Sequence, residues 1–184
     1  VVGRRMRPLN DRTYRGGPVV YWMNRDKRVR DNWALLAAQE FAQQHKEPLG
    51  VVFVFSQKKT IPWRDLSFVV EGLREVETAL RLKGIPFFLL DAGDPVNRIL
   101  PFFRKHRVGA CLTDFSPILD DLKDAERLAR KVSIPVHQSD AHNIVPCWLA
   151  SDHMETTARV FSRKMEKFLP DFLSDFPRLK KRVI

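Results

Sequence analysis

Short apolar runs alternate with longer amphipathic segments along most of this 184-residue chain. Runs rich in β-branched and aromatic residues are typical of strands buried on both faces of a sheet, and the segments between them have helical periodicity. Strands that alternate with helices form right-handed crossovers, which place parallel strands side by side. The sequence therefore predicts an α/β fold that is doubly wound and Rossmann-like, with an open, parallel, five-stranded sheet and helices on both faces. The expected strands are residues 19–23, 49–55, 86–90, 110–113 and 134–137.

Capping residues and prolines indicate where the helices begin and end. Asp31 and Asn32 precede a helix that we expect to reach about His45, and Asp94 followed by proline is a typical helix start. Because proline removes a backbone donor, Pro101 predicts that this second helix is kinked or begins again there.

The longest expected helix covers residues 64–83. Its apolar residues recur at helical spacing, which predicts that they face the sheet. They are Phe68, Leu73, Val76 and Leu80. Further helices are expected over residues 118–131 and 156–169.

Length and charge predict one main domain with basic ends, since a domain usually holds about 100–200 residues. The net charge is +10, of which residues 1–30 contribute +7 and residues 159–184 contribute +5. We expect a flexible basic lead-in over 1–17, the α/β domain over 18–150, and a helix with a linker over 151–184. Basic segments favour a polyanionic partner such as nucleic acid, although solvated tails are the simpler explanation.

Several functional classes are excluded by missing motifs. The sequence has no glycine-rich phosphate loop, no G-x-S-x-G, no H-E-x-x-H and no C-x-x-C, and its five histidines lack metal-ligand spacing. It also has no apolar run near the ~20 residues needed to cross a bilayer, and its arginine-rich start is no secretory signal. We therefore expect a cytoplasmic domain with no membrane or metal partner, with Cys111 and Cys147 reduced.

The predicted architecture indicates where a ligand would bind. In an open parallel sheet, ligands bind beyond the carboxyl ends of the strands, where the strand order reverses. Polar loops follow the apolar strands, and an aspartate lies close to three of the strand ends, at Asp91, Asp114 and Asp140.

The first of these loops lies in the segment from Trp22 to Trp33, which places four cations and two carboxylates between two tryptophans. Arg25 and Asp26 can fix the turn from strand to helix. The same charged groups can also bind a polar ring system, so both interpretations stay open.

This segment resembles the N-terminal signature of the DNA photolyase/cryptochrome family, most closely that of the class II cyclobutane pyrimidine dimer photolyases. Its Arg25–Asp26 pair and the Asp31–Asn32 helix start match the family pattern. The TDFSP segment at 113–117 and the DAHNIVPCW segment at 140–148 resemble class II segments in the same order. The resemblance covers roughly residues 18–178.

The resemblance implies an N-terminal α/β domain that can hold an antenna chromophore, either a deazaflavin or a reduced folate. In this family a separate helical C-terminal domain binds FAD and receives the dimer of UV-damaged DNA, and no residues here match its motifs. We therefore expect the N-terminal domain of a deoxyribodipyrimidine photolyase, without a complete catalytic site. The expected partners are the helical FAD domain and, through the full-length protein, DNA.

The residues predicted to bind the antenna follow the carboxyl ends of the strands. Arg25 can neutralise a phosphate or carboxylate, Asp114 can accept hydrogen bonds, and Phe115 can stack on a ring. The alternative is that these side chains only fix loops or belong to the core. The full set is Asn24, Arg25, Asp31, Asn32, Asp114, Phe115, Ser116 and Asp140.

Two other functions remain open at this point. The chain can be a free-standing nucleotide-binding or regulatory α/β module without repair activity. It can also be a structural domain that only packs on the FAD domain, in which case an exposed apolar patch is expected. The loop over residues 58–62, which borders the predicted site, matches no motif of the family.

Overall fold

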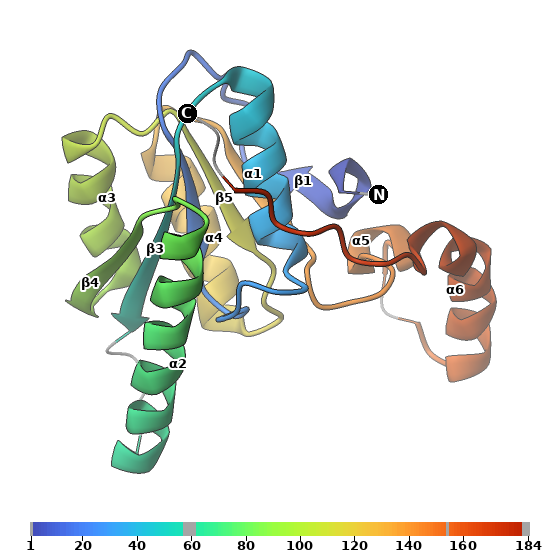
Figure 1. The fold of residues 1–184 in the computed structure, drawn as a ribbon. Coiled ribbons are helices and arrows are strands. Elements are labelled where there is room, and N and C mark those ends of the chain that lie inside the picture. The colour runs from blue at the N-terminus through green and yellow to red at the C-terminus, as the bar shows by residue number, and fades with distance from the viewer. Residues whose placement is uncertain (1, 57–61, 154, 182–184) are drawn as a thin grey trace.

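The computed structural model describes residues 2–56, 62–153 and 155–181 (Figure 1). Its centre is a six-stranded sheet with the order β1-β6-β5-β2-β3-β4. Five neighbouring strands, β2 to β6, are parallel, which confirms the expected sheet. The strands are β1 (Met6–Pro8), β2 (Val19–Met23), β3 (Leu49–Ser56), β4 (Phe87–Gly93), β5 (Ala110–Asp114) and β6 (Val136–Ser139).

The sixth strand, β1, lies in the segment expected to be a flexible lead-in. It pairs antiparallel with β6, so that Met6 lies opposite Ser139 and Pro8 opposite His137. This pairing satisfies the outer edge of β6, whose backbone groups would otherwise face water. The prediction of a flexible lead-in was therefore wrong for these residues, and the expected five-stranded sheet has an additional antiparallel edge strand.

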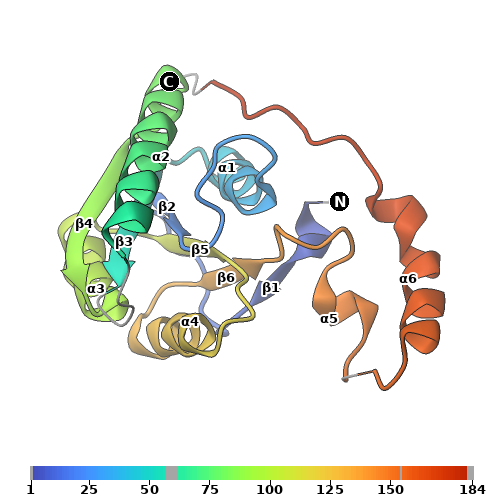
Figure 2. The same cartoon turned by 90° about the horizontal axis from the view of Figure 1, so that it is seen from below.

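Helices cover both faces of the sheet, as predicted. Figure 2 shows α1 and α2 on one side and α3 and α4 on the other. One buried cluster joins α1 and α2 to alternate residues of β2, such as Tyr21, and a second joins α3 and α4 to the intervening residues, such as Trp22. The helices are η1 (Gly3–Arg5), α1 (Trp33–His45), α2 (Trp63–Leu82), α3 (Pro95–Lys105), α4 (Leu119–Lys131), α5 (Cys147–Ala150) and α6 (Ala158–Phe172).

Two helices differ in detail from the sequence prediction. In α2, Leu73, Val76 and Leu80 are buried as expected, but Phe68 is 78% exposed and points away from the core. Leu73 lies five positions after Phe68, which is about 140° around the helix, so the two cannot share a face. In α3, Pro101 lies inside a helix that is continuous from Pro95 to Lys105, so the helix does not begin again there.

The last part of the chain packs on the α1 face instead of extending away as a linker. After α6, residues 173–181 have no regular secondary structure and cross over α1 toward α2 (Figure 2). The ring of Phe176 lies 4.5 Å from that of Trp33, and Leu179 is buried in the core. Gln39 exchanges two hydrogen bonds with the backbone of Lys180, which fixes this segment to α1.

Within the described ranges, no helix has both the length and the apolar character required to cross a membrane.

Candidate functional site at the carboxyl ends of the strands

The strand order reverses between β2 and β5, which are adjacent although two strands separate them in sequence. The helices that follow these strands, α1 and α4, lie on opposite faces of the sheet, so their connecting loops diverge at this point. Such a position is where open α/β sheets usually bind ligands. We call the edge formed by residues 24–32, 115–118 and 140–146 the rim.

Asp114, the last residue of β5, holds the charged corner that follows β2. Its buried carboxylate accepts backbone hydrogen bonds from Asn24 at 2.9 Å, Arg25 at 2.7 Å and Asp26 at 2.5 Å. Burial raises the pKa of the Asp114 carboxyl to about 6, although the backbone donors act in the opposite direction. All three hydrogen bonds are internal, so this carboxylate positions the corner.

Asn32 closes the same corner from the other end. Its side-chain oxygen accepts a hydrogen bond from the Leu35 backbone at 2.9 Å and caps α1, as predicted. Its amide nitrogen lies within hydrogen-bond distance of the Tyr21 hydroxyl and the carbonyls of Asp26 and Arg28. Because Asn32 is fully buried, its polar side-chain atoms form these hydrogen bonds within the protein. The preceding Asp31 is exposed and has a positive φ of 51°.

Asp140 organises the third corner of the rim. One carboxylate oxygen accepts backbone hydrogen bonds from His142 and Asn143, and the other accepts from the Asn143 side chain and the Cys147 backbone. Asp140 is fully buried. Its hydrogen bonds therefore fold the loop that leads into α5.

Arg5, which the sequence analysis did not select, fixes this loop from behind. Its guanidinium donates to the carbonyl oxygens of Asp140, Asn143 and Ile144, at 3.3, 2.8 and 2.6 Å. The same group stacks on Trp33 and Phe172, with its carbon 4.5 and 5.1 Å from the ring centroids. Arg5 is 1% exposed, and burial lowers its pKa. Because its carbonyl partners are remote in sequence, local pattern alone gave no signal for this role.

A buried carboxylate and a histidine join two of the three corners. His142 Nδ1 lies 2.8 Å from Asp26 Oδ1, and Asp26 is 4% exposed. Phe115 also donates its backbone N–H to the Ser139 carbonyl, at the end of the neighbouring strand. The three motif-bearing corners therefore meet along one edge of the sheet, as the sequence predicted.

The Phe115 side chain lines a groove between the sheet edge and the α5–α6 segment. Figure 2 shows this α5–α6 segment beside β1. The groove has a volume of about 1190 Å³. The Phe115 and Trp148 rings meet edge to face with centroids 5.9 Å apart. The Arg7 guanidinium lies 4.7 Å from the Trp148 ring centroid and 5.8 Å from that of Phe115. We call this the Phe115–Trp148 groove.

Arg7 is held in place by its neighbour on β6. Its Nε and Nη2 atoms both donate to Gln138 Oε1, at 3.1 and 2.7 Å. Its remaining nitrogen, Nη1, has no hydrogen bond to another described residue. This arrangement presents a positive charge beside two aromatic rings, which suits a flat, electron-rich or anionic ligand.

The eight predicted site residues thus divide into two groups. Asn32, Asp114 and Asp140 are buried and hydrogen-bonded internally, and the buried Ser116 donates to Asp121 at 2.7 Å. The other four are partly or fully accessible, and their role as ligand contacts stays a prediction: Asn24, Arg25, Asp31 and Phe115. Of the unmatched loop over 58–62, residues 58–61 lie outside the described residues.

Across the described part of the chain, no group of three or more His, Cys, Asp or Glu side chains is arranged to hold a metal ion.

Comparison with known proteins gives a consistent result. A profile of the DNA photolyase family matches residues 19–181. The chain is 40% identical over 167 residues to a deoxyribodipyrimidine photo-lyase of Arabidopsis thaliana, with 89% of this chain and 34% of that protein covered. It is 45% identical over 167 residues to the protein of that name from Potorous tridactylus, with 86% and 30% covered.

A solved structure, the class III photolyase of Agrobacterium tumefaciens, matches with a TM-score of 0.57 at 20% identity. The match covers 70% of this chain and 26% of that one, and it supports the α/β fold. The chain thus spans about a third of the length of the curated relatives described above.

Proposed function

Because the chain belongs to the DNA photolyase family, we propose that it is the N-terminal domain of a deoxyribodipyrimidine photo-lyase, an enzyme that uses light to repair pyrimidine dimers in DNA. The observation that supports this most directly is the meeting of the three motif-bearing corners. Asp114 binds the corner after β2, and His142 of the third corner binds Asp26 of the first. Segments that resemble the family's motifs in sequence therefore meet at one edge of the sheet, which supports the proposal.

The repair chemistry itself belongs to the rest of such an enzyme. When reduced FAD is bound in the helical domain, light drives transfer of one electron to the dimer, which then splits. No motif of that domain occurs in this sequence. We therefore expect the chain alone to show no light-dependent repair of a thymine-dimer oligonucleotide, and repair by the isolated chain would refute the proposal.

We infer that this domain contributes an antenna-chromophore site, and the residues present in the Phe115–Trp148 groove fit such a group. Phe115 and Trp148 provide ring surfaces for a flat heterocycle. Arg7 provides a guanidinium with one nitrogen available for a carboxylate or phosphate. Of the predicted residues, Phe115 lines this groove and four are buried, whereas the accessible Asn24, Arg25 and Asp31 lie outside its described lining.

A binding experiment tests this proposal. The purified chain is mixed with 5,10-methenyltetrahydrofolate or with a deazaflavin, and bound chromophore is measured by its near-UV and blue absorbance after gel filtration. We expect binding of one of the two, and at least a tenfold weaker affinity for Phe115→Ala and Trp148→Ala. Phe176→Ala is the matched control, because Phe176 is a partly exposed ring that stacks on Trp33 outside the groove. No binding of either chromophore would leave the domain as a scaffold only. Equal loss in the control would show that the Phe115–Trp148 groove is not the binding site.

A further inference from the structure

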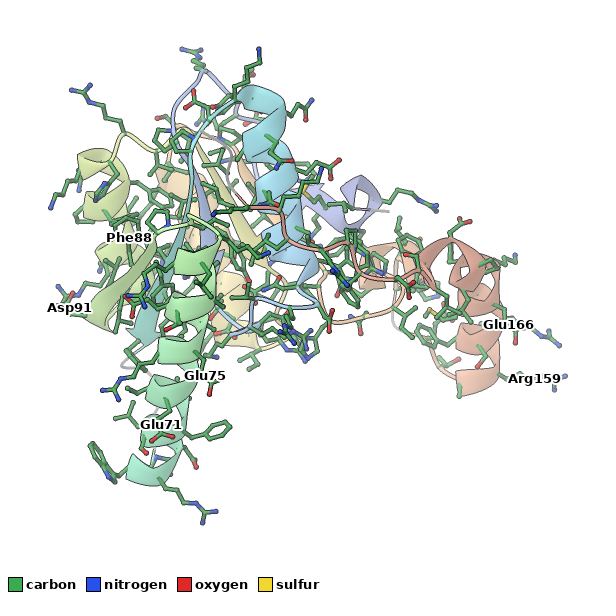
Figure 3. All side chains as sticks on the ribbon, in the orientation of Figure 1. Glu71, Glu75, Phe88, Asp91, Arg159 and Glu166 are labelled. Carbon is green, nitrogen blue, oxygen red and sulfur yellow. The ribbon has the colours of Figure 1, made fainter. Side chains whose placement is uncertain are left out.

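The first half of α2 projects beyond the sheet on which its second half packs. The helix has 20 residues, which corresponds to about 30 Å. All of its buried residues, Leu73, Val76 and Leu80, lie in the second half. Figure 1 shows the other half extending past the carboxyl ends of β3 and β4, and Figure 3 shows side chains there pointing into solvent on several sides. We call residues 63–72 the projecting half of α2.

The projecting half has two large aromatic side chains in water. Trp63 is 80% exposed and Phe68 is 78% exposed, the two most exposed large apolar side chains among the described residues. They are about 140° apart around the helix, because Phe68 lies five positions after Trp63. A surface helix normally has one apolar stripe, which faces its own core. Apolar side chains on two sides of one helix end are instead typical of a segment enclosed by another structure.

The projecting half is continuous with the packed half of α2, and its Val69 side chain packs on the core. Trp63 and Phe68 remain largely exposed. Each aromatic side chain can bury about 150–250 Å² on a partner. The projecting half therefore presents apolar area that a partner can bury, as expected from the sequence if the domain packs on another one.

The position of the chain's last described residues favours one partner. Phe176 to Leu179 and residues Leu82 and Lys83, at the other end of α2, line one cleft of about 690 Å³. In the curated relatives, about two thirds of the protein has no counterpart in this chain. Chain that follows residue 181 in such a protein would start on the α2 face of the sheet, beside the C-terminal end of α2 and about 30 Å along this helix from Trp63.

We propose that the projecting half of α2 docks on the remaining part of a photolyase chain, with Trp63 and Phe68 as its anchors. This inference rests on the proposed function, because the partner is the part of the photo-lyase relatives that has no counterpart in this chain. The partner surface is expected to be apolar and to enclose the helix from two sides.

A chimera tests the docking. The matching N-terminal third of the Arabidopsis thaliana relative is replaced by this chain, and Trp63→Ala/Phe68→Ala is introduced both in the chimera and in the isolated 184-residue chain. We expect the double substitution to lower the thermal midpoint of the chimera by several degrees and to change that of the isolated chain by less than about one degree. Leu119→Ala is the control, because Leu119 is 62% exposed on α4 and lies on the opposite face of the sheet; it is expected to change neither.

Hydrogen exchange gives a second measurement that needs no substitution. Backbone amides of residues 63–72 are expected to exchange at least tenfold more slowly in the chimera than in the isolated chain. Equal exchange, or an equal thermal effect in both proteins, would overturn the proposal. A third result would also overturn it: the isolated chain self-associates, the double substitution abolishes this self-association, and the thermal midpoint of the chimera does not change. The partner of the projecting half would then be a second copy of this chain. Both measurements are made in the dark without DNA, so the absence of repair by the unsubstituted chimera would count against the proposed function and not against the docking.

Discussion

Protonation of Asp114 is expected to make the stability of this domain depend on pH in an unusual direction. The carboxyl is buried at the reversal of strand order, and burial raises its pKa from 3.8 to about 6. In the unfolded chain the same group has its ordinary pKa. Between about pH 4 and pH 6 the folded state therefore holds a proton that the unfolded chain has released. Raising the pH through this window lowers the contribution of Asp114 to the free energy of unfolding.

The size of this effect follows from the shift in pKa. A difference of about two pKa units, at ~1.4 kcal/mol per unit, corresponds to about 3 kcal/mol. Asp114→Asn removes the titration while keeping an oxygen that can accept hydrogen bonds. The quantity to compare is the difference in the free energy of unfolding between the native chain and the variant. We expect this difference, native minus variant, to fall by about 3 kcal/mol between pH 4 and pH 7. Urea unfolding followed by tryptophan fluorescence at several pH values measures this difference.

The opposite sign is physically possible, which makes the test decisive. Three backbone N–H groups point at this carboxylate, and donors of this kind stabilise the charged form. If the difference between native chain and variant increases with pH across the same window, the donors outweigh burial and the reasoning above is refuted. A carboxyl ¹³C titration of Asp114 by NMR gives the same answer without unfolding.

The other predictions concern residues that hold the corners in place. Asn32→Ala is expected to lower the free energy of unfolding by about 2 kcal/mol or more in urea titrations, because a helix cap and three buried contacts of the amide are lost together; a loss below 0.5 kcal/mol would contradict this. Arg5→Ala is expected to accelerate proteolysis of the 140–146 loop. Arg4→Ala removes an exposed ion pair with Asp171, worth about 0–1 kcal/mol, and a cation–π contact with Phe172, neither of which involves a residue of this loop, so cleavage should stay unchanged. Gly109→Ala should lower the thermal midpoint, since a Cβ there would collide with the backbone at residues 16–17. Gly72→Ala should raise the midpoint, because a Cβ there lies in open space on α2 and alanine favours the helix. The reverse order of the two midpoints would disprove the packing described.

The fold was predictable because its signals are local. The apolar runs that became β2 to β6 and the cap residues Asn32 and Asp94 act within a few residues of their own position. By contrast, β1 is three residues long, includes Arg7, and pairs with residues more than 120 positions away. No local pattern indicates such a strand. Phe68 was misplaced although its spacing could have excluded it, because five positions from Leu73 correspond to about 140° around the helix.

The candidate site was predictable in its location and only partly in its chemistry. The rule for open sheets and the three motifs indicated the edge at which the three corners meet. The predicted residues did not include Arg5, Arg7 or Trp148, and the ligand contacts among them stay a prediction. The sequence could not show that the donors to Asp114 are backbone groups almost ninety residues away. Nor could it show that Arg5, in the arginine-rich start, is buried under the Asp140 loop. An aspartate at a strand end looks the same in sequence whether it holds a ligand or a loop.

This division of roles has a consequence for ligand selectivity. Asp114 and Asp140 are occupied by loop hydrogen bonds, so a ligand in the Phe115–Trp148 groove meets two aromatic rings and the Arg7 guanidinium. The groove lining also includes the acidic side chains of Glu126, Asp152 and Glu155. Ring stacking discriminates little between flat heterocycles, since each presents a similar π surface. We therefore expect selectivity to come from the charged side chains of the lining. Among these, Arg7 lies against both rings, and its Nη1, which has no hydrogen bond to another described residue, favours an anionic substituent there. Loss of Arg7 should therefore weaken binding of a carboxylate-bearing chromophore more than that of a neutral flat ring, and an equal loss for both would place the charge recognition elsewhere.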